Sequence, residues 1–143
     1  MEDYDPVSTP LDNNQKLITE THQPSKHEID YMKTVPYQEA IGSILYATQV
    51  SRPDLFFAVG AFSRFNNNSS KSYWIAVKRL FRYIKGTIIY KLEYTRDIEG
   101  CLEGFSDAEW VSDSDDRKST TGYLFKYQGG PISWKTRKTK TNK

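Results

Sequence analysis

The spacing of hydrophobic residues changes once along the chain, close to residue 87. Before that point, apolar side chains recur at steps of three and four, as they do on one face of an amphipathic helix. A proline or a serine stands near the start of each such segment, and a glycine follows the last one. We therefore predict three helices, over residues 36–50, 51–65 and 71–85.

The predicted helix at 71–85 has the clearest pattern. One of its faces carries large apolar residues, namely Trp74, Val77, Leu80, Phe81 and Ile84. The two preceding helices each contain an interior glycine, Gly42 and Gly60, which costs about 1 kcal/mol relative to alanine. We expect close packing between neighbouring helices to explain both glycines.

After Gly86 the hydrophobic pattern alternates, which is typical of strands. We predict strands over residues 88–95, 101–110, 119–128 and 131–136, with a hairpin turn at Gly129 and Gly130. Before residue 36, prolines among polar residues predict an extended segment with little regular structure. The chain is thus expected to be α+β, with four parts: an extended lead-in (1–35), a helical segment (36–87), an antiparallel β-meander (88–136) and a basic tail (137–143).

Composition narrows the class of protein without deciding it. A formal net charge of +2 is too small by itself to indicate a nucleic-acid binder. The single cysteine, Cys101, excludes an internal disulfide and a cysteine-based zinc site. No apolar run approaches the roughly 18 residues of a membrane span, and the acidic N-terminus is unlike a signal peptide. We therefore expect an intracellular protein with no membrane partner.

Basic residues follow one face of the predicted helix at 71–85. They are spaced by seven, four and three positions, at Lys71, Lys78, Arg82 and Lys85. Such a stripe can lie along a phosphate backbone and supply affinity without reading sequence. A solvated face beside an apolar one produces the same pattern, and spacing alone leaves both interpretations open.

Five acids lie close together between residues 107 and 116. Asp107 and Glu109 are two apart in a predicted strand, so they share a face and could bind a hard cation such as Mg²⁺. The other three, Asp113, Asp115 and Asp116, fall in the following loop. Composition alone favours a solvated acidic loop over a metal site. The two histidines, His22 and His27, lack further ligands at metal-binding spacing.

Four sequence blocks, in order, carry a resemblance to a known family. They read YQEAIGSILYATQVSRPDLFFAVGAFSRF, SYWIAVKRLFRYIKGT, GFSDAEWVSDSDDRKSTTGYLF and GGPISWKTRK. Together they resemble consecutive parts of the Pol polyprotein of Ty1/copia-type retrotransposons, from about residue 6 onward. The resemblance implies the end of a reverse transcriptase, its connection segment and the N-terminal part of an RNase H domain. It implies an incomplete RNase H-like fold for residues 88–136, and hence a truncated fragment.

The resemblance also implies roles for individual residues. Asp107 matches the first catalytic aspartate of RNase H, a Mg²⁺ ligand in the complete parent. Family members commonly have aspartate where this chain has Glu109, so a metal role for Glu109 stays open. The reverse-transcriptase signature Tyr-x-Asp-Asp and the helix with the second RNase H carboxylate are not in this sequence. Since two Mg²⁺ ions need several converging carboxylates, we expect the isolated chain to be inactive and to need no cofactor.

The expected partners follow from the same resemblance. In the parent, the helix at 71–85 would touch the phosphates of an RNA–DNA hybrid, alongside the remainder of the polyprotein. Two alternatives remain. The chain could be a domesticated nucleic-acid-binding module that uses this helix face and the basic tail. It could also retain nuclease activity by pairing with another chain that supplies the missing carboxylates.

Overall fold

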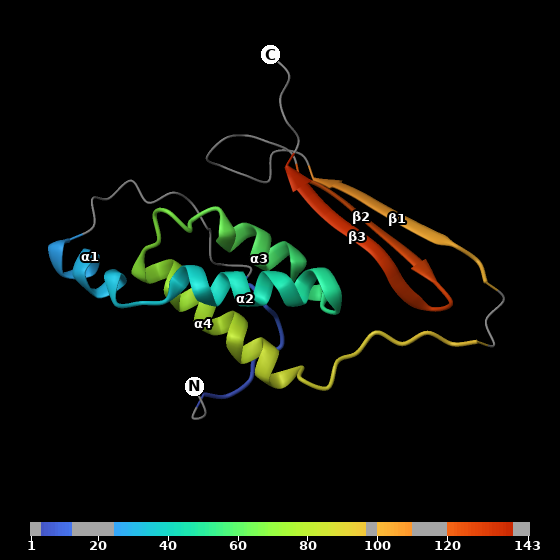
Figure 1. The fold of residues 1–143 in the computed structure, drawn as a ribbon, viewed down its shortest axis with the longest axis horizontal. Helices are drawn as coiled ribbons and strands as arrows, with labels where there is room; N and C mark the ends of the chain where they lie inside the picture. Colours follow the sequence, from blue (N-terminus) through green and yellow to red (C-terminus); the bar gives the residue numbers. More distant parts are fainter. Residues whose placement is uncertain (1–3, 13–24, 97–99, 110–119, 139–143) are drawn as a thin grey trace, which may run out of the picture.

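Helices precede strands along the chain, as the hydrophobic pattern predicts (Figure 1). The computed structural model describes residues 4–12, 25–96, 100–109 and 120–138. These residues form four α-helices, a short 3₁₀ helix and a three-stranded sheet, so the α+β class is confirmed. The elements are α1 (Lys26–Lys33), α2 (Tyr37–Val50), η1 (Pro53–Leu55), α3 (Phe56–Ser63), α4 (Lys71–Gly86), β1 (Glu103–Glu109), β2 (Thr120–Tyr127) and β3 (Gly130–Lys138).

The hydrophobic core lies within the helical unit. Helix α2 begins at Tyr37, one residue later than predicted, because Pro36 is its N-cap residue. It buries residues at helical spacing, namely Tyr37, Ile41, Ile44 and Thr48. These pack against Leu55, Val59 and Phe62 from η1 and α3, which are at most 1% exposed. Helix α4 closes the core with Tyr73, Ala76, Val77, Leu80 and Tyr83. The predicted face of α4 is therefore rotated slightly, and Trp74, Phe81 and Ile84 are half-buried at its edge.

Helix α1 corrects the prediction of a wholly extended lead-in. Residues 26–33 are helical because Ser25 and Glu28 form a capping box. The Ser25 hydroxyl accepts the Glu28 amide at 3.3 Å, and a Glu28 carboxylate oxygen accepts the Ser25 amide at 3.0 Å. The pattern Ser-x-x-Glu is present in the sequence, but the prediction was based on the prolines alone. Residues 4–12 do lack helix and strand, as predicted.

The predicted strand at 88–95 is also wrong. This segment runs extended beneath the sheet in Figure 1 without joining it. Ile88 and Ile89 are 79% and 83% exposed, so the apolar alternation has no buried face to occupy. The backbone amide of Thr95 does donate to the carbonyl of Gln128 at 3.0 Å. One such bond does not make a ladder, because a strand is stabilised by repeated pairing with a neighbour.

The sheet is antiparallel, with its strands in the order β1-β2-β3. The β2–β3 hairpin turns at Gln128 and Gly129, one residue earlier than predicted, and pairs Tyr127 with Gly130. Both turn residues have positive φ, 50° and 80°. Positive φ at both central residues matches the right-handed twist of the strands on either side. The turn thus sets the register in which Leu124 lies opposite Trp134.

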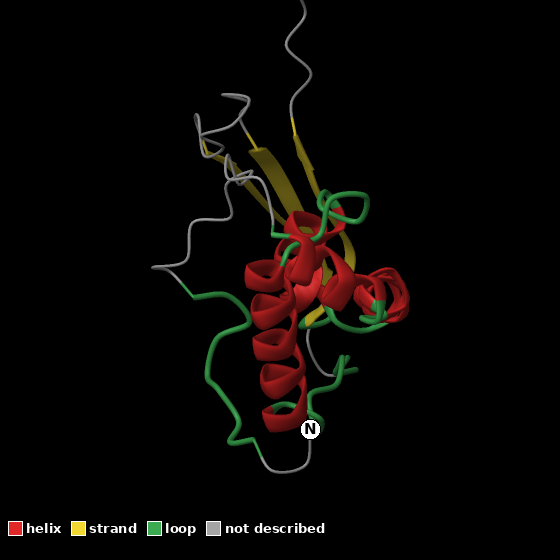
Figure 2. Cartoon of the chain, turned by 90° about the vertical axis from the view of Figure 1, so that its left-hand side faces the viewer, coloured by secondary structure: helices red, strands yellow, loops and turns green. Residues whose placement is uncertain are grey.

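The sheet lies to one side of the helices, nearest α3 (Figures 1 and 2). Trp134 of β3 reaches across, and its indole nitrogen donates to the carbonyl of Thr48 at 2.8 Å. A cavity of about 370 Å³ separates the two layers beside this contact, with Phe56, Phe57 and Leu124 among its walls. The sheet is therefore attached to the helical core through few side chains.

Replacing Gly42 or Gly60 by alanine is expected to raise the free energy of unfolding by about 0.5 to 1 kcal/mol. The expectation of close helix packing at these glycines is wrong, because a Cβ at either position would meet no atom within 4 Å. Alanine would thus gain helix propensity without a clash. Urea unfolding of the two variants measures the effect. A decrease in stability in either variant would contradict the open space that the structure shows.

Candidate nucleic-acid interface

Helix α4 presents the four predicted cations on the side that faces away from its core contacts. The buried residues of α4 form the opposite face. Because that face packs against the core, the four cations face away from it. Lys71 and Lys85, at the two ends of the helix, are exposed, and Lys78 and Arg82 are half-buried. Long basic side chains bury their aliphatic stems and keep the charge accessible. We call these four residues and the adjacent Arg79 the basic face of α4.

The C-terminal half of the basic face is in contact with the N-terminal segment of the chain. Arg82 Nε donates to the carbonyl oxygen of Asp5 at 2.7 Å. Lys85 Nζ donates to the carbonyl oxygen of Tyr4 at 3.2 Å. Two of the predicted phosphate-binding cations therefore already have acceptors within this chain.

Arg79 is a cation of this surface that the sequence pattern did not single out. Its Nη2 donates to the Thr9 hydroxyl at 2.9 Å, and its Nη1 lies 3.9 Å from a carboxylate oxygen of Asp12. Arg79 Nε is buried and has no hydrogen-bond partner within the described residues. The signal that could have found Arg79 is its position next to Lys78, but its partners lie about 70 residues away in sequence.

Residues 4–12, which we call the strap, lie along α4 by apolar contact as well. Val7 and Leu11 are half-buried and pack against the helical core. At the end of α4, a Cβ on Gly86 would lie 2.8 Å from the Cβ of Pro6. Glycine at this position lets the strap approach the helix backbone.

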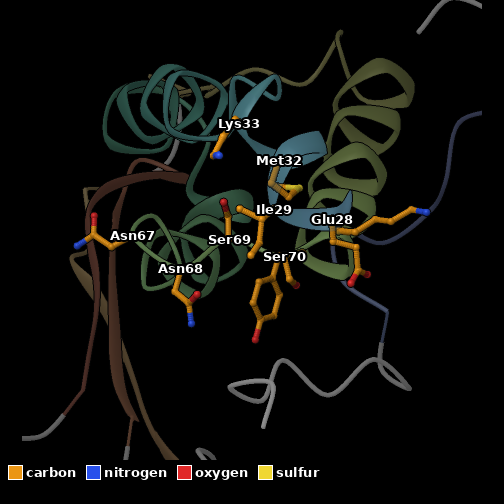
Figure 3. Close-up of a pocket in the computed structure, with 10 residues that line it drawn as sticks. Glu28, Ile29, Met32, Lys33, Asn67, Asn68, Ser69 and Ser70 are labelled. Carbon is orange, nitrogen blue, oxygen red and sulfur yellow. The ribbon is translucent and has the colours of Figure 1, made fainter. Parts of the chain in front are cut away.

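The N-terminal end of the basic face borders a hollow of about 310 Å³ (Figure 3). Helix α1 and the turn before α4 form its walls, which include Asn67, Asn68, Ser69 and Lys71. Glu28 lies on the same wall, and hydrogen bonds from the Ser25 amide and hydroxyl lower the pKa of Glu28. An ionised carboxylate at this rim disfavours a phosphate inside the hollow. The hollow therefore does not extend the basic face.

A second cation, Arg52, has a structural role. Its guanidinium binds both carboxylate oxygens of Asp54, at 2.9 and 2.8 Å. It also donates to the hydroxyl and the carbonyl of Thr87, at 2.7 and 3.3 Å. Its carbon Cζ lies 5.9 and 5.7 Å from the ring centroids of Tyr83 and Tyr90. Arg52 thus joins η1 to the end of α4 and to the segment that leaves the helix.

Asp107 lies within β1, opposite Gly122 of β2. Gly122 lines the cavity next to α3, and residues directly opposite in an antiparallel pair share a face. Asp107 is thus on the helix-facing side of the sheet, where it is exposed. Glu109 ends β1 opposite Thr120. The other predicted acids, Asp113, Asp115 and Asp116, lie outside the described residues, as does His22.

The described residues do not fit a Mg²⁺ site. Nowhere in residues 4–12, 25–96, 100–109 and 120–138 do three or more His, Cys, Asp or Glu side chains come together in a way that could hold a metal ion. A hard divalent cation needs several oxygen ligands at once, and Asp107 supplies two at most. In the same part of the chain, no helix is long and apolar enough to cross a membrane.

Curated proteins with similar sequences cover most of this chain. It is 47% identical over 110 residues to the secreted RxLR effector protein 161 of Plasmopara viticola, a match that covers 77% of this chain and 78% of that protein. It is 42% identical over 137 residues to the retrovirus-related Pol polyprotein from transposon TNT 1-94 of Nicotiana tabacum. It is 34% identical over 137 residues to the Pol polyprotein from transposon RE2 of Arabidopsis thaliana.

The two polyprotein matches cover 96% and 94% of this chain but 10% and 9% of the polyproteins. The chain therefore corresponds to a segment about a tenth as long as the Pol polyproteins that it matches. No protein-family model matches the chain, and neither does any solved structure. Nearly full-length similarity to several such polyproteins shows that the chain belongs to the copia-type retrotransposon Pol polyprotein family.

Proposed function

We propose that this segment helps a copia-type Pol polyprotein hold an RNA–DNA hybrid, with the basic face of α4 lying along the phosphates. The observation that carries the proposal is the placement of several cations on one outward side of a helix whose other side is core. Arg and Lys that neutralise phosphates release condensed counterions, so they give affinity that depends on salt and not on base sequence. This is the kind of contact that an enzyme processing any template requires.

The sheet has a different role in this proposal. Residues 100–138 would form the opening strands of an RNase H domain, with Asp107 in the first catalytic position of the complete parent. The antiparallel strand order and the location of Asp107 within β1, where it is exposed, support this assignment. Because the helix with the second RNase H carboxylate is not in this sequence, we assign no hydrolytic step to this chain. We infer that the segment binds a hybrid and does not cut it by itself.

A second candidate is a stand-alone nucleic-acid-binding module that uses the same basic face. The relative of which this chain covers more than three quarters is not named as a polyprotein. Its match to this segment favours the view that the segment also exists apart from long polyproteins. Both candidates require the same contact between α4 and phosphate, so one binding experiment tests that contact for both.

Replacing Lys78 by glutamine is expected to weaken hybrid binding and to reduce the magnitude of the salt slope, log Kd against log salt, by about one. Lys78 is suited to the test because, among the described residues, the hydrogen bonds and the ion pair to the strap come from Arg79, Arg82 and Lys85 instead. Fluorescence anisotropy with a labelled RNA–DNA hybrid over a salt series measures both quantities. The same change at Lys71 should have a similar effect, since each change removes one phosphate contact.

The matched control is Lys91→Gln, which removes one exposed lysine away from α4 that pairs with Glu93 at 3.6 Å. It should leave the salt slope nearly unchanged. A slope near zero for the unchanged protein, or equal losses in the Lys78 and Lys91 variants, would reject the basic face as the binding surface. With Mg²⁺ added, the hybrid should remain intact. Cleavage that Asp107→Asn abolishes would contradict the inference that this chain does not cut the hybrid by itself.

A further inference from the structure

We propose that the strap, residues 4–12, competes with nucleic-acid phosphates for the basic face of α4 and thereby limits access to it. The inference rests on the proposed function, in which that face binds phosphate. It adds a regulation of the same site that follows from the contacts of the strap. In this view the chain carries its own reversible inhibitor of hybrid binding.

The strap uses the same donors that a phosphate would use. Arg82 Nε and Lys85 Nζ point at backbone carbonyl oxygens of Asp5 and Tyr4, at 2.7 and 3.2 Å. Arg79 donates to Thr9 and faces the carboxylate of Asp12. While these bonds exist, the donors are turned toward the strap and the strap occupies the adjacent space. A duplex that reaches all five cations must therefore displace residues 4–12.

The contacts between the strap and α4 are weak enough for nucleic-acid phosphates to replace them. Its polar contacts are mostly to uncharged acceptors, and the ion pair between Arg79 and Asp12 is long and partly exposed. Its apolar anchors are two half-buried side chains, Val7 and Leu11. Charge-assisted hydrogen bonds to phosphate are roughly twice as strong as bonds to neutral acceptors. Lys71 and Lys78 offer an entry point, because the hydrogen bonds and the ion pair from the strap in the described ranges go to Arg79, Arg82 and Lys85.

Gly86 provides a way to release the strap without altering any charge. The Cβ of Gly86→Ala would lie 2.8 Å from the Cβ of Pro6, closer than side chains tolerate. The Cβ of Pro6 is fixed by the backbone of the strap, so no rotamer change can move it aside. The strap must therefore shift away from the end of α4, next to Lys85.

Anisotropy titrations with a labelled RNA–DNA hybrid, in full-length protein, test the competition. Gly86→Ala is expected to bind the hybrid about threefold to tenfold more tightly. In this variant the strap is already displaced, so binding no longer depends on a minor population with an open basic face. Its salt slope should steepen by about one for each cation that is freed. A second variant, Val7→Ser, weakens the strap from its own side and should shift the affinity in the same direction. Gly42→Ala is the control for added helix propensity and should bind like the unchanged protein.

The outcomes distinguish a failure of the strap competition from a failure of the proposed function. If the unchanged protein, Gly86→Ala and Val7→Ser bind with equal affinity and equal salt slope, the competition is wrong and the binding face stands. If none of them binds at low salt, the proposed function fails and the regulation fails with it. Circular dichroism shows whether Gly86→Ala remains folded, and Val7→Ser decides the matter if it does not.

Discussion

Replacing Arg52 with alanine is expected to lower the free energy of unfolding by about 2 to 3 kcal/mol, somewhat less than for a fully buried ion pair. The Arg52 side chain is 11% exposed, and its partner Asp54 is 30% exposed. Without the guanidinium, Asp54 keeps the Tyr83 hydroxyl as a donor at 3.1 Å but loses both arginine bonds. The carbonyl of Thr87 loses its donor at the C-terminal cap of α4 as well. Partly buried acceptors are thus left with fewer hydrogen bonds, which is destabilising.

The acid sensitivity of the protein should change in the same variant. Burial raises the pKa of Asp54, but the hydrogen bonds and charge of Arg52 and the bond from Tyr83 outweigh it, and the pKa lies below its ordinary value of 3.8. The unfolded chain therefore binds this proton more readily than the native chain does. The ionised Asp54 carboxylate therefore contributes to the free energy of unfolding above about pH 4, and this contribution is lost as pH falls through the pKa of Asp54 in the native state. Arg52→Ala should lack this part of the pH dependence.

Urea unfolding at pH 7 and at steps down to pH 3 measures both effects. The control is Lys33→Ala, which removes an exposed ion pair with Asp30 whose side chains are 70% and 57% exposed. Such a pair contributes about 0.5 kcal/mol or less. If Arg52→Ala loses no more stability than Lys33→Ala, or keeps the full acid response, the Arg52 network is not the stabilising link described here.

Replacing Phe62 with alanine is expected to lower the free energy of unfolding by about 4 kcal/mol. Phe62 is completely buried at the centre of the helical core, where neighbours from α2, α3 and α4 surround it. Its carbonyl also accepts the Tyr37 hydroxyl at 3.1 Å, which holds α2 against α3. Truncation removes apolar contacts and leaves a cavity that these helices close only in part.

Phe57→Ala is the matched control, since Phe57 lies in the same helix and is 50% exposed. Its loss should lower stability by about 1 kcal/mol or less, because most of its removed surface already faces solvent or the open cavity beside the sheet. Guanidinium unfolding of both variants gives the comparison. Equal losses at the two positions would mean that the core is not centred on Phe62.

The helices that could be predicted from the sequence are those with a buried face of their own. Helices α2 and α4 were recognised because their apolar residues recur at helical spacing, and both are close to the predicted bounds. Helix α1 buries none of its residues, so the pattern carried no signal, and its capping box alone marked it. Local hydrogen bonding therefore determines the structure of α1, where hydrophobic periodicity gives no prediction.

The segment 88–95 shows the opposite limit of sequence patterns. Its alternation of apolar and polar residues is what a strand requires, but a strand also requires a neighbour. The sheet completes its pairing with three strands. The segment contributes one backbone bond, from Thr95 to Gln128, and one side-chain bond, from the Tyr94 hydroxyl to the carbonyl of Pro131. Whether a neighbouring strand is available depends on the tertiary structure, so it cannot be predicted from a local sequence pattern.

Some features of the candidate site could also be predicted from the sequence, and others could not. Lys71, Lys78, Arg82 and Lys85 were placed on one side of a helix by spacing, and the structure brings them to that side. The contacts of Arg79, Arg82 and Lys85 with the strap could not be predicted, because they join residues 70 to 81 positions apart. Asp107 was placed in a strand, and its neighbours there became known only with the strand register. Binding by these residues and a catalytic position for Asp107 remain predictions.

The long sequence separation between the strap and α4 has a consequence for the order of events during synthesis. The strap leaves the ribosome 70 to 81 residues before the cations that it contacts. At about 5 to 20 residues per second, the strap waits roughly 4 to 16 seconds for its docking surface. The strap is therefore already available when α4 emerges, and it cannot dock before that helix has formed. Until then, the apolar strap residues Val7 and Leu11 have no helical core to pack against.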